Sequence, residues 1–230
     1  MALSRNEVLD GALRVLDQVG LEELTMRRLA KALRVQAGAI YWHFANKQDL
    51  YDAMSEAMMS GLLEPPPTGP WDQQLAELAR RVASSLARHR DGARLATLAL
   101  RPGPNGLAVS ETMLRIVRDA GFGKNVTVWA TSVLGYYLLG YVTDVQALQA
   151  AKRRGLEAVL RSVGKSIDKK RYPLLHELSA PGIMQMMSAA AFESRFEFGL
   201  RVILDGLKAT RRRAPPKRRP KTNKRRRRVT

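Results

Sequence analysis

The stretch from Thr25 to Lys47, TMRRLAKALRVQAGAIYWHFANK, constrains the fold more than any other part of the chain. Its apolar residues recur at helical spacing in two short runs, which are separated by a break at Val35 and Gln36. Thr25 suits the start of the first helix, because its hydroxyl can accept a hydrogen bond from a free backbone N–H. Two short helices joined by so tight a break predict a helix-turn-helix unit.

The second of these helices leaves two large aromatic side chains and a histidine facing outward. Ile40 and Phe44 lie one turn apart and are expected to point into the core. Tyr41, Trp42 and His43 are then left on the exposed side. A group of exposed aromatic side chains favours a partner surface.

DNA is the partner that this pattern favours. Small residues at the start of the second helix would let its backbone approach base edges in the major groove. Nearby hydroxyl, imidazole and ammonium groups would bond to phosphates, and Arg27 could read guanine with two hydrogen bonds. We therefore expect the DNA-binding residues to be Arg27, Arg28, Gln36, Ala37, Gly38, Ala39, Tyr41, Trp42, His43 and Lys47.

The pattern T-x-R-x-L-A-x-x-L-x-V followed by G-A-I-Y-W-H-F-x-x-K resembles the DNA-binding domain of the TetR family of one-component repressors. One departure is Arg34, where the family usually has a glycine that ends the helix in a left-handed conformation. The resemblance implies a three-helix head, and a fourth helix that connects it to a helical domain for ligand binding and dimerisation.

The remaining sequence is helical in pattern. Ser4 and Glu7 form a capping box at the start of the first helix, and Gly20 ends that helix. The segment EPPPTGP at 64–70 interrupts the helices, and Asp91 is expected to cap a short helix that runs to Leu98. The expected fold class is all-α, with a helix-turn-helix DNA-binding domain over 1–47, a helical regulatory domain over 48–209 and a disordered basic tail over 210–230.

Residues 125–143 form the most apolar stretch, with no charge between Lys124 and Asp144. Its length approaches that of a membrane span, but polar and glycine residues dilute it and no second span accompanies it. We interpret it as the buried centre of a helical domain and expect no membrane association. The chain has no cysteine and its N-terminus lacks a signal-peptide pattern, so a cytoplasmic location is expected.

The second half resembles the regulatory domain of the tetracycline repressors within that family, through HRDGA at 89–93, Arg101-Pro102 and F-x-F-G-L-x-x-I-L-x-G-L at 196–207. Those repressors bind a drug–magnesium chelate through histidines and polar amides. The corresponding positions here carry Met58 or Met59, Ala96 or Thr97, Leu78 and Met113, which offer almost no oxygen ligands for a hard cation. We therefore expect no metal site, no cofactor and a small, largely apolar organic ligand.

The expected ligand-binding residues combine apolar side chains with tyrosine hydroxyls, although ordinary core packing is the alternative for each. They are Met58, Leu78, Val82, Leu86, Leu95, Met113, Val117, Trp129, Val133, Tyr136 and Tyr137. The last helix, 189–207, is apolar on more than one side, which favours a two-fold dimer. The expected interface residues are Phe192, Phe196, Gly199 and Ile203.

Most of the net charge of +18 lies at the C-terminus. Twelve Lys or Arg residues and no acid fall between Arg211 and Arg228, and the remaining 27 basic and 21 acidic residues leave only +6. We interpret this tail as a second contact to DNA that does not depend on the DNA sequence. The alternative is a solvated tail with no role in the cell.

These observations predict a ligand-responsive transcriptional regulator. It would act as a repressor that binds a palindromic DNA operator as a homodimer and is released by a small organic molecule. An enzyme is not expected, because the sequence has no G-x-S-x-G, H-E-x-x-H or paired acidic motif with a plausible pocket. The triplet Gly164-Lys165-Ser166 resembles the end of a phosphate-binding loop but has Val159 where that loop requires glycine. The alternatives are a non-specific architectural DNA-binding protein driven by the basic tail, and a helical adaptor whose Tyr41–His43 face binds protein.

Overall fold

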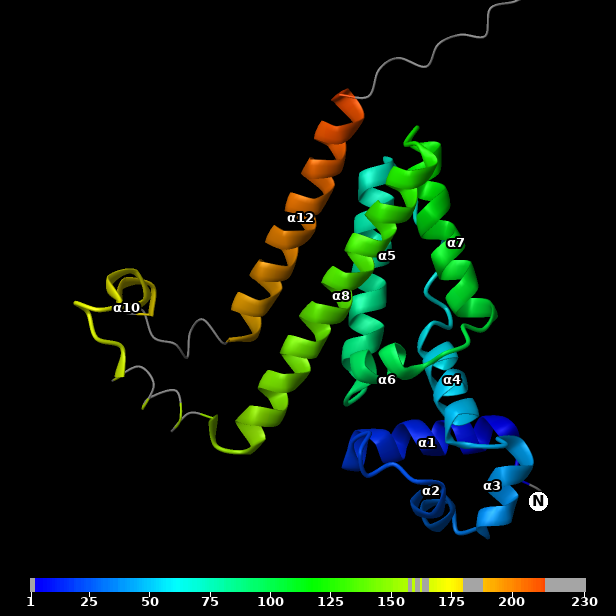
Figure 1. The fold of residues 1–230 in the computed structure, drawn as a ribbon. Helices are drawn as coiled ribbons and strands as arrows, with labels where there is room; N and C mark the ends of the chain where they lie inside the picture. The colour runs from blue at the N-terminus through cyan, green and yellow to red at the C-terminus, as the bar shows by residue number, and fades with distance from the viewer. Residues whose placement is uncertain (1–2, 157–158, 160–161, 163–165, 180–187, 214–230) are drawn as a thin grey trace, which may run out of the picture.

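A computed structural model describes residues 3–156, 159, 162, 166–179 and 188–213, and its regular elements there are all helices (Figure 1). The helices are α1 (Arg5–Val19), α2 (Met26–Ala32), α3 (Ala37–His43), α4 (Lys47–Met58), α5 (Trp71–Arg88), α6 (Gly92–Leu98), α7 (Pro104–Asp119), α8 (Lys124–Arg153), α10 (Pro173–Ser179) and α12 (Ala189–Arg213).

Helices α1 to α3 form a small domain at one end of the molecule, which we call the head. The capping box at the start of α1 is confirmed, since Ser4 Oγ accepts a hydrogen bond from the Glu7 N–H at 3.2 Å and the Glu7 carboxylate accepts one from the Ser4 N–H at 2.7 Å. Thr25 caps α2 in the expected way, with its hydroxyl accepting from the Arg28 N–H at 3.1 Å. The buried side chains that hold the three helices together include Leu16, Leu29, Ile40 and Phe44.

The turn between α2 and α3 places a non-glycine residue in the left-handed region. Arg34 has a φ of 57°, and the Val35 N–H donates to the Ala30 carbonyl at 3.0 Å. This hydrogen bond spans five residues, as in the helix ending that glycine usually makes. The chain therefore keeps the turn that the resemblance predicted, with an arginine in a conformation that favours glycine.

The regulatory domain is a bundle built on α5, α7 and α8, with α6 lying across its lower end and α4 running down to the head (Figure 1). Trp71 and Phe122 close the upper end of the bundle, with ring centroids 5.4 Å apart. Helix α12 lies against α8, where the ring of Phe196 stacks on Tyr137 at 5.7 Å and lies 4.6 Å from Tyr141.

Helix α8 contains residues 125–143, which the sequence predicted to be the buried centre of a helical domain. This prediction was wrong, because one side of the helix is exposed. Ala130, Leu134 and Leu138 are buried, whereas Trp129, Val133 and Tyr136 are 63%, 50% and 74% exposed. The helices of one chain cover only part of the α8 surface, which leaves an apolar face to solvent. Within the described part of the chain, no helix is both long enough and apolar enough to cross a membrane.

Helix α12 also extends further than expected. The predicted tail began at residue 210, but the helix continues to Arg213. The remaining tail residues, 214–230, lie outside the described residues.

The left-handed turn gives a test of stability. Replacing Arg34 with glycine should raise the free energy of unfolding by about 1 kcal/mol, because glycine adopts this backbone conformation without a Cβ penalty. Lys31→Gly, inside α2, is the control and should lower it by about 1 kcal/mol. Urea unfolding followed by circular dichroism measures both, and equal destabilisation by the two variants would contradict the assigned turn.

Candidate nucleic-acid interface and its link to the regulatory domain

Helix α3 presents the expected surface to a partner. Ile40 and Phe44 are almost fully buried, while Tyr41 is 50% and Trp42 is 87% exposed. Gln36 occupies the N-cap position of α3, but its side chain makes no capping hydrogen bond and is exposed. Its amide is therefore free to contact a ligand at the helix start.

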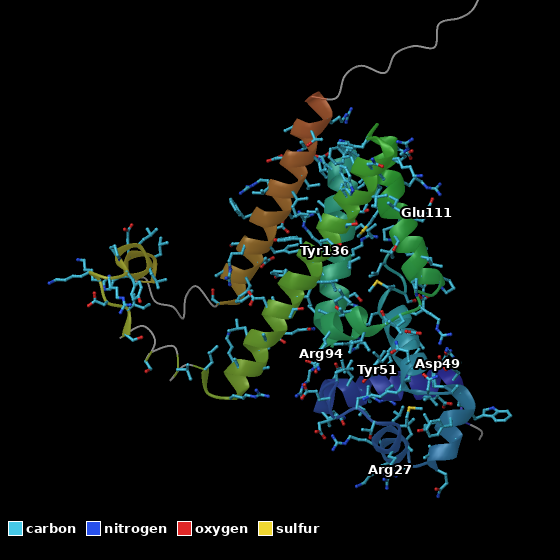
Figure 2. All side chains as sticks on the ribbon, in the orientation of Figure 1. Arg27, Asp49, Tyr51, Arg94, Glu111 and Tyr136 are labelled. Carbon is cyan, nitrogen blue, oxygen red and sulfur yellow. The ribbon has the colours of Figure 1, made fainter. Side chains whose placement is uncertain are left out.

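The small residues at the start of α3 leave the helix backbone accessible. Gly38 is exposed, and a Cβ built there would meet no atom within 4 Å. Packing within the chain therefore does not require glycine at this position. Arg27 projects from α2 on the side of the head that faces away from the regulatory helices (Figure 2).

Three of the expected DNA-binding side chains also have partners within the chain. His43 is half-buried and its Nε2 donates to the Leu3 carbonyl at 2.7 Å, which corrects the expectation that its ring is fully exposed. Arg28 pairs with Glu23 at 2.9 Å. The Lys47 ammonium lies 5.3 Å from the centre of the Tyr51 ring.

Acidic side chains on one face of α4 bind residues 98–106, which we call the 98–106 segment. It comprises the end of α6, the connection between the two helices and the start of α7. We call Asp49, Asp52 and Glu56 the α4 carboxylate row. Asp52 accepts hydrogen bonds from the Leu100 N–H at 2.8 Å and from Arg101 Nε at 3.1 Å, and Asp49 pairs with the same guanidinium. The row therefore fixes the chain just after α6 to the helix that enters the head.

Glu56 fixes the start of α7 to α4. Its carboxylate accepts from the Asn105 N–H at 2.5 Å and from the Gly106 N–H at 3.0 Å. These are among the first N–H groups of α7, which have no partner within their own helix, and a negative charge is favoured at that end of a helix. On the other side of the segment, Gln48 Nε2 donates to the Leu98 carbonyl at the end of α6 at 2.9 Å.

Asp52 is the most buried carboxylate of the row. Burial alone would raise the pKa of its carboxyl, but hydrogen bonds from Gln48, Leu100 and Arg101 outweigh that effect. The pKa of Asp52 therefore lies below its ordinary value, and the ionised form is stabilised in the folded protein.

A second contact joins the regulatory domain to the end of α1. Asp17 accepts from the Arg90 N–H at 2.9 Å and lies 3.1 Å from His89 Nδ1. Asp91 was expected to cap α6 with its side chain, but that carboxylate instead accepts from the Leu21 N–H of the head at 2.8 Å. The prediction failed because a long-range partner competes for the same oxygen.

The contact at the α4 carboxylate row and the contact at Asp17 lie on opposite sides of the head. Figure 2 shows Asp49 at one side of the junction and Arg94, which pairs with Glu22 at 2.9 Å, at the other. A cleft of about 680 Å³ lies between the head and the α4 side of this junction. Among the described residues it is lined by Arg5, Asn6, Leu9, His43, Phe44, Asp49, Asp52, Ala53, Glu56, Ala57, Ser60, Arg101, Pro102, Gly103, Pro104 and Asn105.

The expected ligand-binding residues separate into two groups. The buried group lies in the interior of α4 to α7 and consists of Met58, Leu78, Val82, Leu86, Leu95, Met113 and Val117. Trp129, Val133 and Tyr136 lie on the exposed face of α8 and do not share this interior, which departs from the expectation. Tyr137 lies between α8 and α12, where its hydroxyl donates to the Phe196 carbonyl at 2.7 Å.

The expected interface residues of α12 are mostly used within the chain. Phe192 and Phe196 are 7% and 6% exposed, and a Cβ added at Gly199 would lie 2.5 Å from the Tyr137 hydroxyl. Ile203 is half-buried. The small residue beside the phenylalanines therefore allows close packing of α12 on α8, whereas the large apolar side chains of Phe198 and Val202 on the same helix are exposed.

The sequence interpretation missed the residues that join the two domains. Asp49, Asp52 and Glu56 follow a spacing of three and four residues, which places them on one face of a helix. That spacing could have revealed a shared acidic face. It could not have shown that backbone N–H groups some 50 positions later are the partners.

Comparisons with known proteins cover both parts of the chain. Residues 8–54 match the family described as bacterial regulatory proteins, tetR family, and residues 64–211 match the tetracyclin repressor-like, C-terminal domain. The tetracycline repressor protein class E of Escherichia coli is 33% identical over 90% of this chain and 92% of its own length.

Solved structures agree with these matches. The crystal structure of a possible TetR family transcriptional regulator from Streptomyces coelicolor A3(2) is 37% identical, with a TM-score of 0.77 over 90% of this chain and all of that one. The Streptomyces coelicolor TetR family protein ActR, in complex with actinorhodin, is 29% identical, with a TM-score of 0.76 over 91% of this chain and 98% of that one.

The lowered pKa of Asp52 gives a prediction of pH dependence. Because the folded state lowers this pKa, its contribution to stability is full above the ordinary carboxyl value of about 3.9 and is lost as the pH falls further. Asp52→Asn should lower the free energy of unfolding by about 1 kcal/mol at neutral pH. The difference from the wild-type protein should shrink below that ordinary value.

Denaturant unfolding of the wild-type and Asp52→Asn proteins, from neutral pH to below about pH 3.9, measures this difference in the free energy of unfolding. Asp49→Asn is the control, since Asp49 shares Arg101 but is more exposed and bonds no backbone N–H of the 98–106 segment in the structure as described. A difference between Asp52→Asn and wild type that did not change with pH would contradict the assignment.

Proposed function

Because the chain belongs to the tetR family of bacterial regulatory proteins and is thus a DNA-binding transcriptional regulator, we propose that it is a repressor whose α3 helices read a near-palindromic operator. The outward face of α3 is the observation that carries this proposal. A helix with Ile40 fully buried and Trp42 almost fully exposed has one side for the core and one for a partner.

The groups on this face suit DNA in two ways. Gln36 and Arg27 have side chains that can make paired hydrogen bonds to base edges, and the open backbone around Gly38 allows close approach. The Tyr41 hydroxyl and the Trp42 indole N–H can donate to phosphates, which set the register of the helix on the duplex. Half-sites read in successive major grooves would lie about one helical turn apart or slightly more.

Selection from random-sequence duplexes tests this proposal. The wild-type protein should recover a near-palindrome, and Tyr41→Phe should bind that duplex more weakly because it loses one hydroxyl. A loss of about 1 kcal/mol per half-site corresponds to a weakening of about 30-fold for a dimer. Trp42→Ala should weaken binding further, and both variants should keep the thermal stability of the wild-type protein.

Tyr172→Phe, which changes an exposed tyrosine next to α10, is the matched control and should bind like the wild-type protein. Recovery of no preferred duplex would contradict sequence-specific reading and would favour an architectural DNA-binding protein. Unchanged DNA affinity in Tyr41→Phe and Trp42→Ala would favour an adaptor role for this face.

We further propose that a small, largely apolar organic molecule releases the DNA. Relatives of this chain are tetracycline repressors, and the related ActR protein holds actinorhodin. The core of the regulatory domain here is made of aliphatic and thioether side chains such as Leu78, Val82 and Met113, and a site opened among them would suit an apolar ligand better than a hydrated cation.

The α4 carboxylate row is the proposed route from that interior to the head. A ligand that displaces the 98–106 segment must either carry α4 with it or break the hydrogen bonds of Asp52 and Glu56. Release requires that the ligand bind more tightly to the arrangement in which the heads no longer fit the operator.

Regulators of this family bind DNA as dimers, and the exposed face of α8 is where we propose that two copies meet. Trp129, Val133 and Tyr136 lie on this face, and Phe198 and Val202 are exposed on the neighbouring α12. An apolar patch of this kind on two adjacent helices matches the composition of an interface core. It replaces the interface expected from Phe192 and Phe196, which the chain buries itself.

Two valines on α8 give a matched test of this interface. Val133 and Val128 are 50% and 49% exposed, but Val128 belongs to a shallow groove between α7 and α8. Val133→Glu should weaken dimerisation by at least about 100-fold, since a two-fold interface would bury the new charge twice. Val128→Glu should leave the dimer intact. Sedimentation velocity measures both, and equal effects would contradict the assigned face.

A further inference from the structure

Arg34 occupies a backbone conformation that costs the folded protein stability. Its φ of 57° lies in the left-handed region, and two backbone hydrogen bonds of the turn hold it there. The Arg34 N–H donates to the Lys31 carbonyl at 3.2 Å, and the Val35 N–H donates to the Ala30 carbonyl at 3.0 Å. A Cβ is disfavoured in this conformation, whereas glycine adopts it freely. Strained residues of this kind cluster at functional sites.

The side chain of Arg34 has no partner that would explain an arginine in this turn. It is exposed, and among the residues that the structure describes it has no hydrogen bond, ion pair or ring contact. The contacts of the folded chain therefore do not compensate for the strained backbone. A partner outside the chain could do so.

The charges around the turn increase the cost further. Residues 25–48 contain no acidic residue, and their five Lys or Arg residues are Arg27, Arg28, Lys31, Arg34 and Lys47. Arg27 and Lys31 lie one turn apart on α2, and both are exposed and unpaired within the described part of the chain. Like charges at this spacing repel each other. An anion bound beside them would relieve this repulsion.

The turn lies at the edge of the surface that we propose reads DNA. It joins α2 to α3 at the side of the head farthest from the regulatory helices (Figure 1). Arg34 precedes Gln36, the N-cap residue of α3, by two positions, so their Cα atoms are at most about 7.6 Å apart. The start of a recognition helix enters a major groove about 12 Å wide, which phosphates border on both sides. A long side chain at this distance from the helix start can therefore reach a bordering phosphate.

We propose that Arg34 binds a backbone phosphate at the edge of the major groove that α3 enters. This inference rests on the proposed function of the head and adds to it a contact from outside α3. A guanidinium suits a phosphate because its paired N–H groups match the phosphate oxygens in both charge and geometry. The contact fixes the position of the head on the duplex without reading sequence, and it offsets the strain that the turn carries in the free protein.

Two substitutions at Arg34 separate the side chain from the backbone. The affinity of the full-length variants for the duplex recovered by selection is measured between about 50 and about 200 mM salt. Arg34→Gly and Arg34→Gln should each bind about 30-fold more weakly than the wild-type protein, which is about fivefold for each half-site of a dimer. The slope of log affinity against log salt should become shallower by about 1.8, or about 0.9 for each of two phosphates.

Stability distinguishes these two variants from each other. Arg34→Gly should unfold at a higher denaturant concentration than the wild-type protein, because it removes the Cβ from the left-handed turn. Arg34→Gln keeps the Cβ and should not gain this stability. Weaker DNA binding by a more stable protein cannot result from damage to the fold, so Arg34→Gly tests the contact directly.

Two further variants serve as controls for charge. Arg34→Lys keeps the charge, so it should keep the salt slope and lose less affinity than Arg34→Gln. Lys124→Gln also removes one positive charge, but at the start of α8, close to the contact of Phe122 with Trp71 at the upper end of the bundle. It should leave both the affinity and the salt slope unchanged.

A random-sequence duplex separates a phosphate contact from base reading. Arg34→Gln should lose affinity for this duplex by a factor similar to that for the recovered duplex, because a phosphate contact does not depend on sequence. Selection with Arg34→Gln should recover the same near-palindrome as selection with the wild-type protein.

Three results would overturn the proposal. Wild-type affinity and salt slope in Arg34→Gly or Arg34→Gln would show that the side chain does not contact DNA. A different near-palindrome recovered with Arg34→Gln would show that Arg34 reads a base. An equal loss in Lys124→Gln would assign the effect to net charge alone. Failure of the wild-type protein to recover any preferred duplex would instead contradict the proposed function of the head, and the random-sequence duplex would still decide whether Arg34 binds phosphate.

Discussion

The carboxylates along one face of α4 connect the two parts of this protein. The opposite face of the helix is apolar and packs into the core through Leu50 and Met54. Asp52 and Glu56 meet backbone N–H groups of the segment between α6 and α7. A buried carboxylate without partners is costly, so separating α4 from this segment would carry a free-energy cost at Asp52.

The contact at Asp17 gives the head a second point of attachment. With α4 held on one side and the end of α1 on the other, the head cannot rotate about α4 alone without breaking the hydrogen bond from the Arg90 N–H. The orientation of α3 therefore depends on both ends of α6, since residues 89–91 precede that helix and the 98–106 segment begins at its last residue. These two sets of contacts therefore lie at the two ends of one short helix, α6.

Local signals in the sequence were sufficient for the head. Ser4 with Glu7, Thr25, Gly20 and the spacing of Ile40 and Phe44 each act within a few residues, and each was predicted correctly. Signals that depend on distant partners were not sufficient. Asp91 has the residue type of a helix cap, but its oxygen accepts a hydrogen bond from Leu21, seventy positions away.

The sequence by itself determined the all-helical class, the helix-turn-helix head and the outward face of α3, because helical periodicity and capping depend on neighbours along the chain. Only the tertiary structure decided which apolar faces are covered. It buried Phe196 against Tyr137 and left Trp129 and Tyr136 exposed, although all four have similar hydrophobic character. Composition cannot distinguish them, because exposure depends on which helices pack together and where one chain no longer supplies a neighbour.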